Sequence, residues 1–216
     1  MFLHEIMKGA DPSHLAFTGE VDVTYGALED AIHRYRNAIY ALGVREGERV
    51  SLYSANRAEF VYAFMAVVSL GAIIVPVNNS LVDREVDYIL KDSGSTLLIT
   101  DTPMDVSVPS ISIEELDEKS REPLPEAPDF PKTITEDDVC ALIYTSGTTG
   151  SPKGAMLTHK NLVRNVEQFT ARIIFKPEDK VLCVLPMFHC YGMTTIVHGS
   201  LYAHSTIVIL RSRTPS

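Results

Sequence analysis

Length, composition and charge place this chain among globular proteins with a buried core. It has 216 residues, of which 45% are hydrophobic, 22% charged and 8% aromatic, as in ordinary soluble domains. The net charge of −9 is uneven, with −7 over residues 1–113, −7 over 114–138 and +5 over 139–216. No basic stripe or cluster is present, so a nucleic-acid partner is not expected.

Membrane and secreted classes are also disfavoured. The longest apolar runs, such as 61–70, fall short of the roughly 20 residues that span a bilayer, so no transmembrane segment is expected. The start, MFLHEIMKG, has an acid and no long apolar stretch, unlike a secretory signal. A cytoplasmic location follows as the prediction. The chain has an odd number of cysteines, Cys140, Cys183 and Cys190, and they lack C-x-x-C spacing. This pattern favours reduced thiols over disulfide bonds or a zinc site.

In chain order, the first clear element is a helix. Apolar residues from Leu28 to Leu42 keep the spacing of one helical face, with Thr24 as N-cap and Gly43 as the stop. Strands and helices then alternate over 49–54, 57–70, 72–77, 82–91 and 95–100. Asn56 is the expected cap of the second helix. This alternation predicts an α/β fold with parallel strands covered by helices on both faces.

A Pro-rich acidic stretch divides the pattern. Four prolines within nine residues exclude a regular helix or central strand, so 121–134 is predicted to connect an α/β subdomain at 1–120 to a second one at 135–216. Further elements are expected over 139–144, 155–157, 159–174, 180–185, 193–203 and 205–210. Because no helix follows to cover the last strand, one edge or face of the sheet should lack its partner. The second subdomain should therefore be incomplete and the chain a fragment.

The segment YTSGTTGSPKG, residues 144–154, carries the strongest chemical signal. Its three glycines let the backbone approach a ligand with N–H groups pointing inward, and its hydroxyls add donors. Lys153 adds a positive charge that attracts phosphate. Pro152 and Gly154 flank that lysine, so the Walker pattern does not match. The segment predicts a different phosphate-binding loop; the alternative is a mobile Gly/Ser surface loop.

This loop resembles the signature of the AMP-forming adenylating superfamily, which includes acyl-CoA synthetases, aryl-CoA ligases, luciferase and the adenylation domains of peptide synthetases. Three other segments resemble family motifs in the same order: TYGAL at 24–28, SLGAIIVPVNN at 69–79 and LPMFHCYGM at 185–193. The resemblance therefore covers nearly the whole chain. It implies the N-terminal part of the large domain of an acyl-CoA synthetase, an α/β fold with mostly parallel sheets flanked by helices, here truncated.

The resemblance implies a two-step reaction. A carboxylate attacks the α-phosphate of ATP to give an acyl-adenylate and pyrophosphate, and coenzyme A then displaces AMP to form a thioester. The positions that match the family's β- and γ-phosphate contacts are Thr145, Ser146, Gly147, Thr148, Thr149, Gly150 and Lys153. Thr145 also matches a position near Mg²⁺, although the family's metal-binding carboxylate has no counterpart in this chain.

His189 and its neighbours are the other implied site residues. A lone His is commonly a packed or surface residue, but the matching family residue lies beside the α-phosphate and the reacting carboxylate. The resemblance assigns catalysis to His189 and Lys153 and the border of the acyl pocket to Gly192 and Met193. His198 and a second histidine six residues later lack a third metal ligand, which makes a metal site there a weak alternative.

Several functional alternatives stay open at this point. The leading hypothesis is an ATP-dependent fatty acyl-CoA ligase, since the stretch HCYGMT looks closer to fatty acyl members than to peptide synthetases. An aryl or other carboxylate ligase and a stand-alone nucleotide-binding module without catalysis are the alternatives. The family's adenine, ribose and coenzyme A contacts find no match here, so the fragment alone should be inactive. An incomplete sheet would also favour association, for instance as a homodimer.

Overall fold

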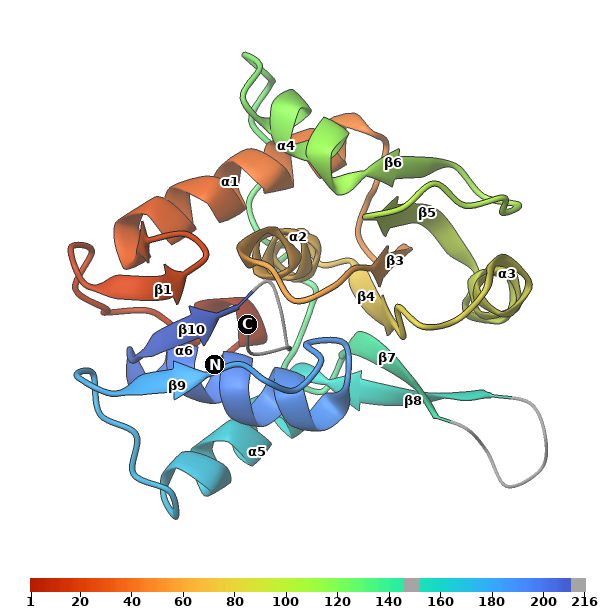
Figure 1. The fold of residues 1–216 in the computed structure, drawn as a ribbon. Coiled ribbons are helices and arrows are strands. Elements are labelled where there is room, and N and C mark those ends of the chain that lie inside the picture. Colours follow the sequence, from red (N-terminus) through yellow and green to blue (C-terminus); the bar gives the residue numbers. More distant parts are fainter. Residues whose placement is uncertain (146–151, 211–216) are drawn as a thin grey trace.

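The computed structural model describes residues 1–145 and 152–210, and its strands form two sheets (Figure 1). One sheet has six strands in the order β6-β5-β3-β4-β7-β8, and the other has four in the order β2-β1-β10-β9. The elements in chain order are η1 (Leu3–Glu5), β1 (Leu15–Gly19), β2 (Val23–Thr24), α1 (Tyr25–Ala41), β3 (Arg49–Tyr53), α2 (Ala58–Ser69), β4 (Ile73–Val77), α3 (Asp83–Ser93), β5 (Ser95–Thr100), β6 (Ser110–Ser112), α4 (Ile113–Ser120), β7 (Val139–Thr145), β8 (Lys153–Thr158), α5 (His159–Thr170), β9 (Lys180–Leu182), the π-helix η2 (Gly192–His198), α6 (Gly199–Ala203) and β10 (Thr206–Ile209).

The six-stranded sheet is parallel except at β8. β3 lies between β4 and β5, with Val50 opposite Ile74 and Leu97. β7 runs parallel to β4, and β8 returns antiparallel to β7 as a hairpin. Mostly parallel sheets with helices on their faces were predicted from the alternating pattern, and the structure confirms this class of fold.

Helices cover the six-stranded sheet on both faces. α2 has eleven buried residues among its twelve, as expected for a helix that is apolar all round. It belongs to the main core, which takes residues from both sheets, and Figure 1 shows it end-on between them. α3 packs on the opposite face with a smaller core that includes Val75, Ile89 and Leu98. The strands β3 and β4 therefore lie between the buried helix α2 and the outer helix α3.

Both sheets combine strands from before and after the Pro-rich connector. β10 lies between β1 and β9 and runs parallel to both, while β7 pairs with β4. The connector at 121–134 therefore separates strands in the sequence that lie in the same sheet in the fold. Its role as a boundary between two subdomains stays a prediction. The last described strand is internal rather than an edge, because hydrogen bonds join it to a neighbour on each side. The edge strands of this sheet are β2 and β9, and Leu182 in β9 is 46% exposed.

Most expected elements form, with local corrections. Thr24 caps α1 by accepting a hydrogen bond from the Ala27 N–H at 3.2 Å. Gly94 ends α3 in the left-handed conformation at φ 64°. The N-cap of α2 is Arg57, without a side-chain cap, because the Asn56 amide bonds elsewhere. The helix expected over 193–203 begins as a π-helix, and η1, β1, β2, β6 and α4 were not anticipated.

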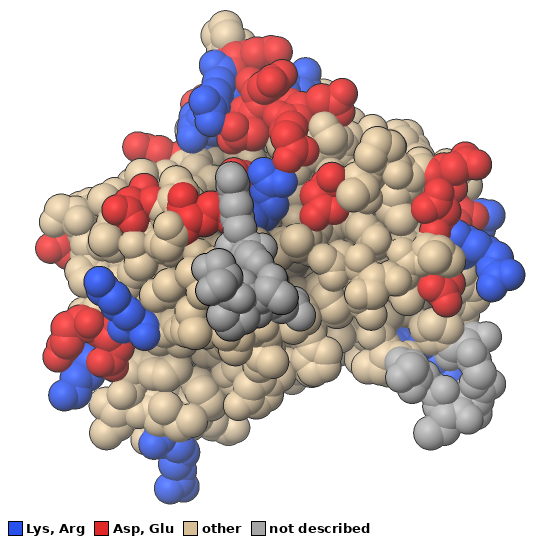
Figure 2. All heavy atoms as spheres, viewed as in Figure 1, with Lys and Arg blue, Asp and Glu red and all other residues tan. Residues whose placement is uncertain are grey.

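The surface agrees with the charge distribution of the sequence. Figure 2 shows acidic side chains gathered at the top of the molecule, over α4, and scattered basic side chains that form no continuous patch on the visible face. α4 itself carries acids in its first turn, at Glu114 and Glu115. Within the described ranges, no helix combines the length and apolarity needed to cross a membrane.

Candidate active site

A cavity of about 320 Å³ lies where the carboxyl ends of β4 and β7 face the segment after β9. Its walls come from three parts of the chain, namely β4 with α3, the β7–β8 hairpin, and residues 188–190. The lining residues are Pro76, Asn78, Leu81, Ile89, Ile143, Tyr144, Thr145, Pro152, Phe188, His189 and Cys190. In open parallel sheets, ligands bind at the carboxyl ends of the strands, so this cavity is the candidate site.

The predicted phosphate loop joins β7 to β8. Thr145 and Lys153 are opposite each other in the last register pair of this hairpin, so the fold brings them to the two sides of the loop. Thr145 lines the cavity, whereas the exposed Lys153 does not. Five predicted contacts lie outside the described residues: Ser146, Gly147, Thr148, Thr149 and Gly150.

Side chains of α3 anchor the hairpin on both sides of the loop. The Tyr144 hydroxyl donates a 2.6 Å hydrogen bond to Asp92 Oδ2. Burial and the Asp92 carboxylate raise the pKa of Tyr144, so its hydroxyl stays protonated and acts as a donor. A Cβ at Gly154 would lie 3.1 Å from the Tyr144 ring, so a larger residue there would require the ring to shift. Tyr88 reaches the Pro152 carbonyl at 3.4 Å. The loop is therefore carried on a strand pair that α3 holds in place.

His189 is exposed, lines the cavity, and has a defined tautomer. Its Nδ1 accepts a hydrogen bond from the backbone N–H of Tyr191 at 3.2 Å. In the neutral ring the proton is then on Nε2, where it can be donated to a ligand oxygen. Its backbone N–H donates to Pro186 O at 3.1 Å and its carbonyl accepts from Met193 N at 2.9 Å. The histidine thus sits between a tight turn and the start of η2.

Gly192 and Met193 begin η2 just behind His189. A Cβ at Gly192 would lie 2.3 Å from the Pro186 carbonyl oxygen, so only glycine lets the helix approach this turn. Met193 is buried at 1% exposure. Neither residue lines the cavity. The helical turns here are π-helical, a local irregularity often found near functional sites.

A metal site made by protein ligands is not seen in the part of the chain that the structure describes. No group of three His, Cys, Asp or Glu side chains is placed to hold an ion there, and this includes His198 and His204. Thr145 offers one hydroxyl oxygen, the type of ligand that Mg²⁺ prefers. A magnesium ion beside Thr145 would therefore need most of its ligands from elsewhere, for example phosphate oxygens.

Sequence reasoning missed some of the cavity residues. Asn78 and Phe188 lie in the segments that carried the family resemblance, which was the available signal, but no role was assigned to them. A larger hollow of about 480 Å³ lies beside η1 and α1, with His4, Arg36 and Phe130 in its wall. It contains none of the predicted site residues. We therefore take the smaller cavity, next to the phosphate loop, as the functional one.

The fold and site define an α/β protein in which Thr145, the residue before a Gly- and hydroxyl-rich segment, lines the same cavity as His189 at the carboxyl ends of the strands. The chain belongs to the AMP-binding enzyme family, whose profile matches residues 7–216. This finding confirms the resemblance drawn from the four sequence motifs.

The curated relatives are CoA ligases, and their names refer to several different carboxylic acids. 4-Coumarate–CoA ligase 3 of Arabidopsis thaliana is 32% identical over 206 residues, covering 87% of this chain and 37% of the relative. Feruloyl-CoA synthase of an Amycolatopsis species is 33% identical, covering 88% of this chain and 39% of the relative. Long-chain-fatty-acid–CoA ligase FadD13 of Mycobacterium tuberculosis is 31% identical, with shares of 84% and 39%. This chain thus spans about two fifths of these relatives.

Solved structures agree on the fold. O-succinylbenzoate coenzyme A synthetase (MenE) from Bacillus subtilis, in complex with AMP, has a TM-score of 0.87 and 29% identity, covering 98% of this chain and 56% of its own. ATP-bound MatB from Rhodopseudomonas palustris has a TM-score of 0.86 and 25% identity, with shares of 97% and 45%. The described fold is therefore the N-terminal portion of such adenylate-forming enzymes.

Proposed function

We propose that this chain is the N-terminal part of an AMP-forming CoA ligase, which activates a carboxylic acid as an acyl-adenylate and transfers it to coenzyme A. The observation that supports this most directly is the shared cavity, because Thr145 and His189 line one space beside the phosphate loop. The first step needs a triphosphate and a carboxylate held together. A site that holds both makes the attack effectively unimolecular.

The phosphate loop would hold the triphosphate of ATP. In this proposal residues 145–150 donate backbone and hydroxyl hydrogen bonds to the β- and γ-phosphates, and Lys153 adds charge from the other side of the hairpin. Magnesium enters as part of the Mg·ATP substrate, with the Thr145 hydroxyl next to the ion.

His189 would act at the reacting centre as a hydrogen-bond donor. Its Nδ1 already accepts from Tyr191 N–H, so Nε2–H is the group that can face the α-phosphate or the carboxylate. Because the attacking carboxylate is already ionised, no proton has to be removed. Preorganised donation to developing charge is the larger catalytic effect in such a step. Gly192 and Met193, directly behind His189, would border the acyl group.

We infer a fatty acid as the substrate from the HCYGMT stretch, with an aromatic acid as the second candidate. The fatty acid is supported by the likeness to FadD13. The aromatic acid is supported by the 4-coumarate and feruloyl names of relatives with similar identity. A carboxylate-dependent ATP–pyrophosphate exchange assay on the full-length protein, with palmitate and 4-coumarate in parallel, separates the two by their kcat/KM values.

A first experiment addresses the nucleotide site directly. Isothermal titration of the purified 216-residue chain with Mg·ATP, and then with pyrophosphate, measures whether the loop binds the triphosphate. Binding of both ligands is the expected result. Folded protein that binds neither would mean that the remaining segments shape the site. The stand-alone nucleotide-binding module is supported only if the full-length protein also binds ATP but shows no exchange with any carboxylate.

A further inference from the structure

Asn56 joins the two sheets at their carboxyl edges. It lies just after β3 of the six-stranded sheet, and its side-chain amide reaches the segment that follows β9 of the four-stranded sheet. Nδ2 donates to Leu185 O at 2.8 Å, with a longer contact to Cys183 O at 3.4 Å. Oδ1 accepts from Met187 N–H at 2.7 Å. One side chain thus satisfies both a carbonyl and an N–H of the segment that leads to His189.

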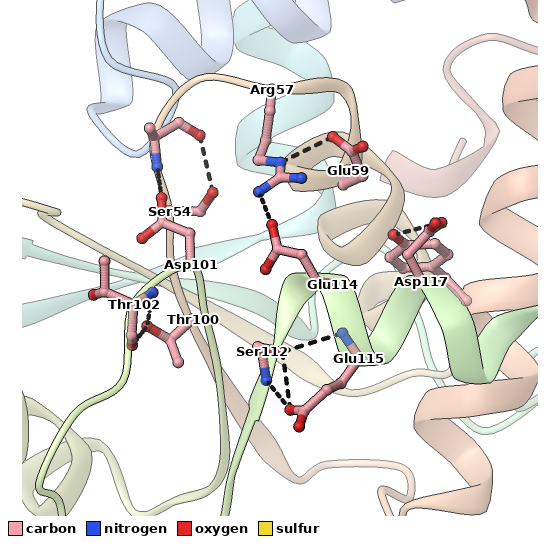
Figure 3. A network of polar contacts seen from close by, with 12 residues as sticks. Ser54, Arg57, Glu59, Thr100, Asp101, Thr102, Ser112, Glu114, Glu115 and Asp117 are labelled. Atoms are coloured by element: carbon pink, nitrogen blue, oxygen red, sulfur yellow. Dashed lines mark hydrogen bonds and ion pairs between the residues drawn. The ribbon is translucent and has the colours of Figure 1, made fainter.

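The loop that carries Asn56 is itself held on both sides, as Figure 3 shows. The N–H of Ala55 donates to Asp101 Oδ2 at 2.7 Å. Arg57 pairs with Glu59 at 3.0 Å and with Glu114 at 2.7 Å. These contacts come from the end of β5, from α2 and from α4. Asn56 therefore extends from an ordered base rather than from a mobile turn.

The bonded segment connects to His189 through a single tight turn. The His189 N–H donates to Pro186 O at 3.1 Å, and Pro186 lies between the two residues that Asn56 bonds most closely. Gly192 packs against the same carbonyl oxygen. Met187 is fully buried. A shift of the 185–187 backbone would consequently move the imidazole relative to Thr145, which lines the same cavity.

We propose that Asn56 is a positioning residue, which sets the distance between His189 and Thr145 by tying the 185–187 backbone to the end of β3. This inference rests on the proposed adenylation function. Asn56 does not line the cavity, so it acts through the segment and not on substrate. Displacements of about 1 Å at a reacting group can cost on the order of a hundredfold in rate.

The first test measures the order of the segment without using activity. Cys183, at 5% exposure, lies beside the Asn56 amide, while Cys140, at 1% exposure, lies in β7 and serves as an internal reference. In Asn56→Ala of the full-length protein, alkylation of Cys183 by iodoacetamide, quantified by peptide mass spectrometry, should rise about tenfold relative to Cys140.

The second test measures the reaction. In the same variant, kcat for carboxylate-dependent ATP–pyrophosphate exchange should fall about tenfold to a hundredfold. KM for ATP should change by less than about threefold, because the triphosphate loop belongs to the hairpin that α3 holds. Asn37→Ala is the matched control: it loses a buried 2.9 Å hydrogen bond to Ala127 N–H, far from the cavity. This control should leave kcat and Cys183 alkylation unchanged.

The outcomes are distinct. Unchanged kcat in Asn56→Ala, with or without faster Cys183 alkylation, overturns the positioning role. Equal loss of kcat in Asn56→Ala and Asn37→Ala also overturns it, since the effect would then be general destabilisation. If Asn56→Ala does not fold, Asn56→Asp is used, and the same changes are expected because the bond to Leu185 O is lost. A parent protein without exchange activity refutes the proposed function instead, and the alkylation test still reports whether Asn56 orders the segment.

Discussion

His198 shows how a single buried side chain can oppose stability. It is fully buried beside Phe64, and both of its ring nitrogens lack a hydrogen-bond partner among the described residues. Leaving such buried groups unsatisfied costs about 1–3 kcal/mol. Burial also lowers the pKa of His198 from 6.5 to about 3, so the folded protein keeps it neutral.

His198→Leu should therefore stabilise the protein by about 1–3 kcal/mol at pH 7. Below pH 6.5 the unfolded parent binds a proton that the folded parent cannot, so the parent loses stability as the pH falls from 6.5 toward 3. The variant lacks this loss, and its advantage should widen at pH 5. Urea unfolding at both pH values measures the difference. His33→Leu, which removes an exposed histidine paired with Glu126, is the control; an equal widening there would contradict the assignment.

Lys153 is the residue whose charge the phosphate proposal uses. Replacing it by alanine removes a charge-assisted contact worth about 1.5–3 kcal/mol, so Mg·ATP and pyrophosphate should each bind about tenfold to a hundredfold more weakly. Isothermal titration measures both affinities. Lys160→Ala is the matched control, because Lys160 lies on α5 in an ion pair with Asp137. Indistinguishable affinities for the parent and Lys153→Ala would refute the assigned role.

At the scale of elements, the hairpin β7–β8 depends on α3 for its position. The Tyr144 hydroxyl bond to Asp92 is short, at 2.6 Å, and its acceptor is a carboxylate. A buried hydrogen bond to a charged group contributes about 1.5–3 kcal/mol, and this contact is partly exposed. Tyr144→Phe should therefore lower the free energy of unfolding by about 1 kcal/mol. Triphosphate affinity should fall with it, as the loop's support loosens.

The matched control for this prediction is on the same helix. Tyr88→Phe removes only a long 3.4 Å contact to the Pro152 carbonyl, so its effect on unfolding should stay within about 0.5 kcal/mol. Chemical denaturation and ATP titration of both variants supply the comparison. Equal effects of the two substitutions would mean that Asp92 does not anchor the hairpin.

At the scale of the whole molecule, the chain spans about two fifths of its curated relatives. We expect the 216-residue chain alone to be inactive and to form neither acyl-adenylate nor thioester, because the family contacts to adenine, ribose and coenzyme A have no counterpart in its sequence. A coupled assay for ATP-dependent pyrophosphate release measures this, with the full-length protein as the positive control. Release by the purified fragment would contradict the prediction. A cytoplasmic location and a homodimer stay predictions as well.

Much of the fold follows from local sequence patterns. The helical periodicity after Thr24 and the left-handed stop at Gly94 act within a few residues of the chain, so they can be read before any tertiary contact is known. The phosphate loop is similar, since its glycines, hydroxyls and Lys153 lie within eleven consecutive residues. The family assignment rests on such short motifs, and for this reason it could be made from the sequence.

Other features depend on residues that meet only in the folded chain. No sequence pattern predicts three of these contacts. They are the pairing of β10 with β1, the contact of Asn56 with Cys183 across 127 residues, and the cavity shared by Thr145 and His189. The sequence motifs indicated the chemistry of this protein because the residues of a phosphate loop are close together in the sequence. Tertiary structure decided which side chains hold that chemistry in place, because a polar amide such as Asn56 bonds whichever backbone groups the packing of two sheets brings within reach.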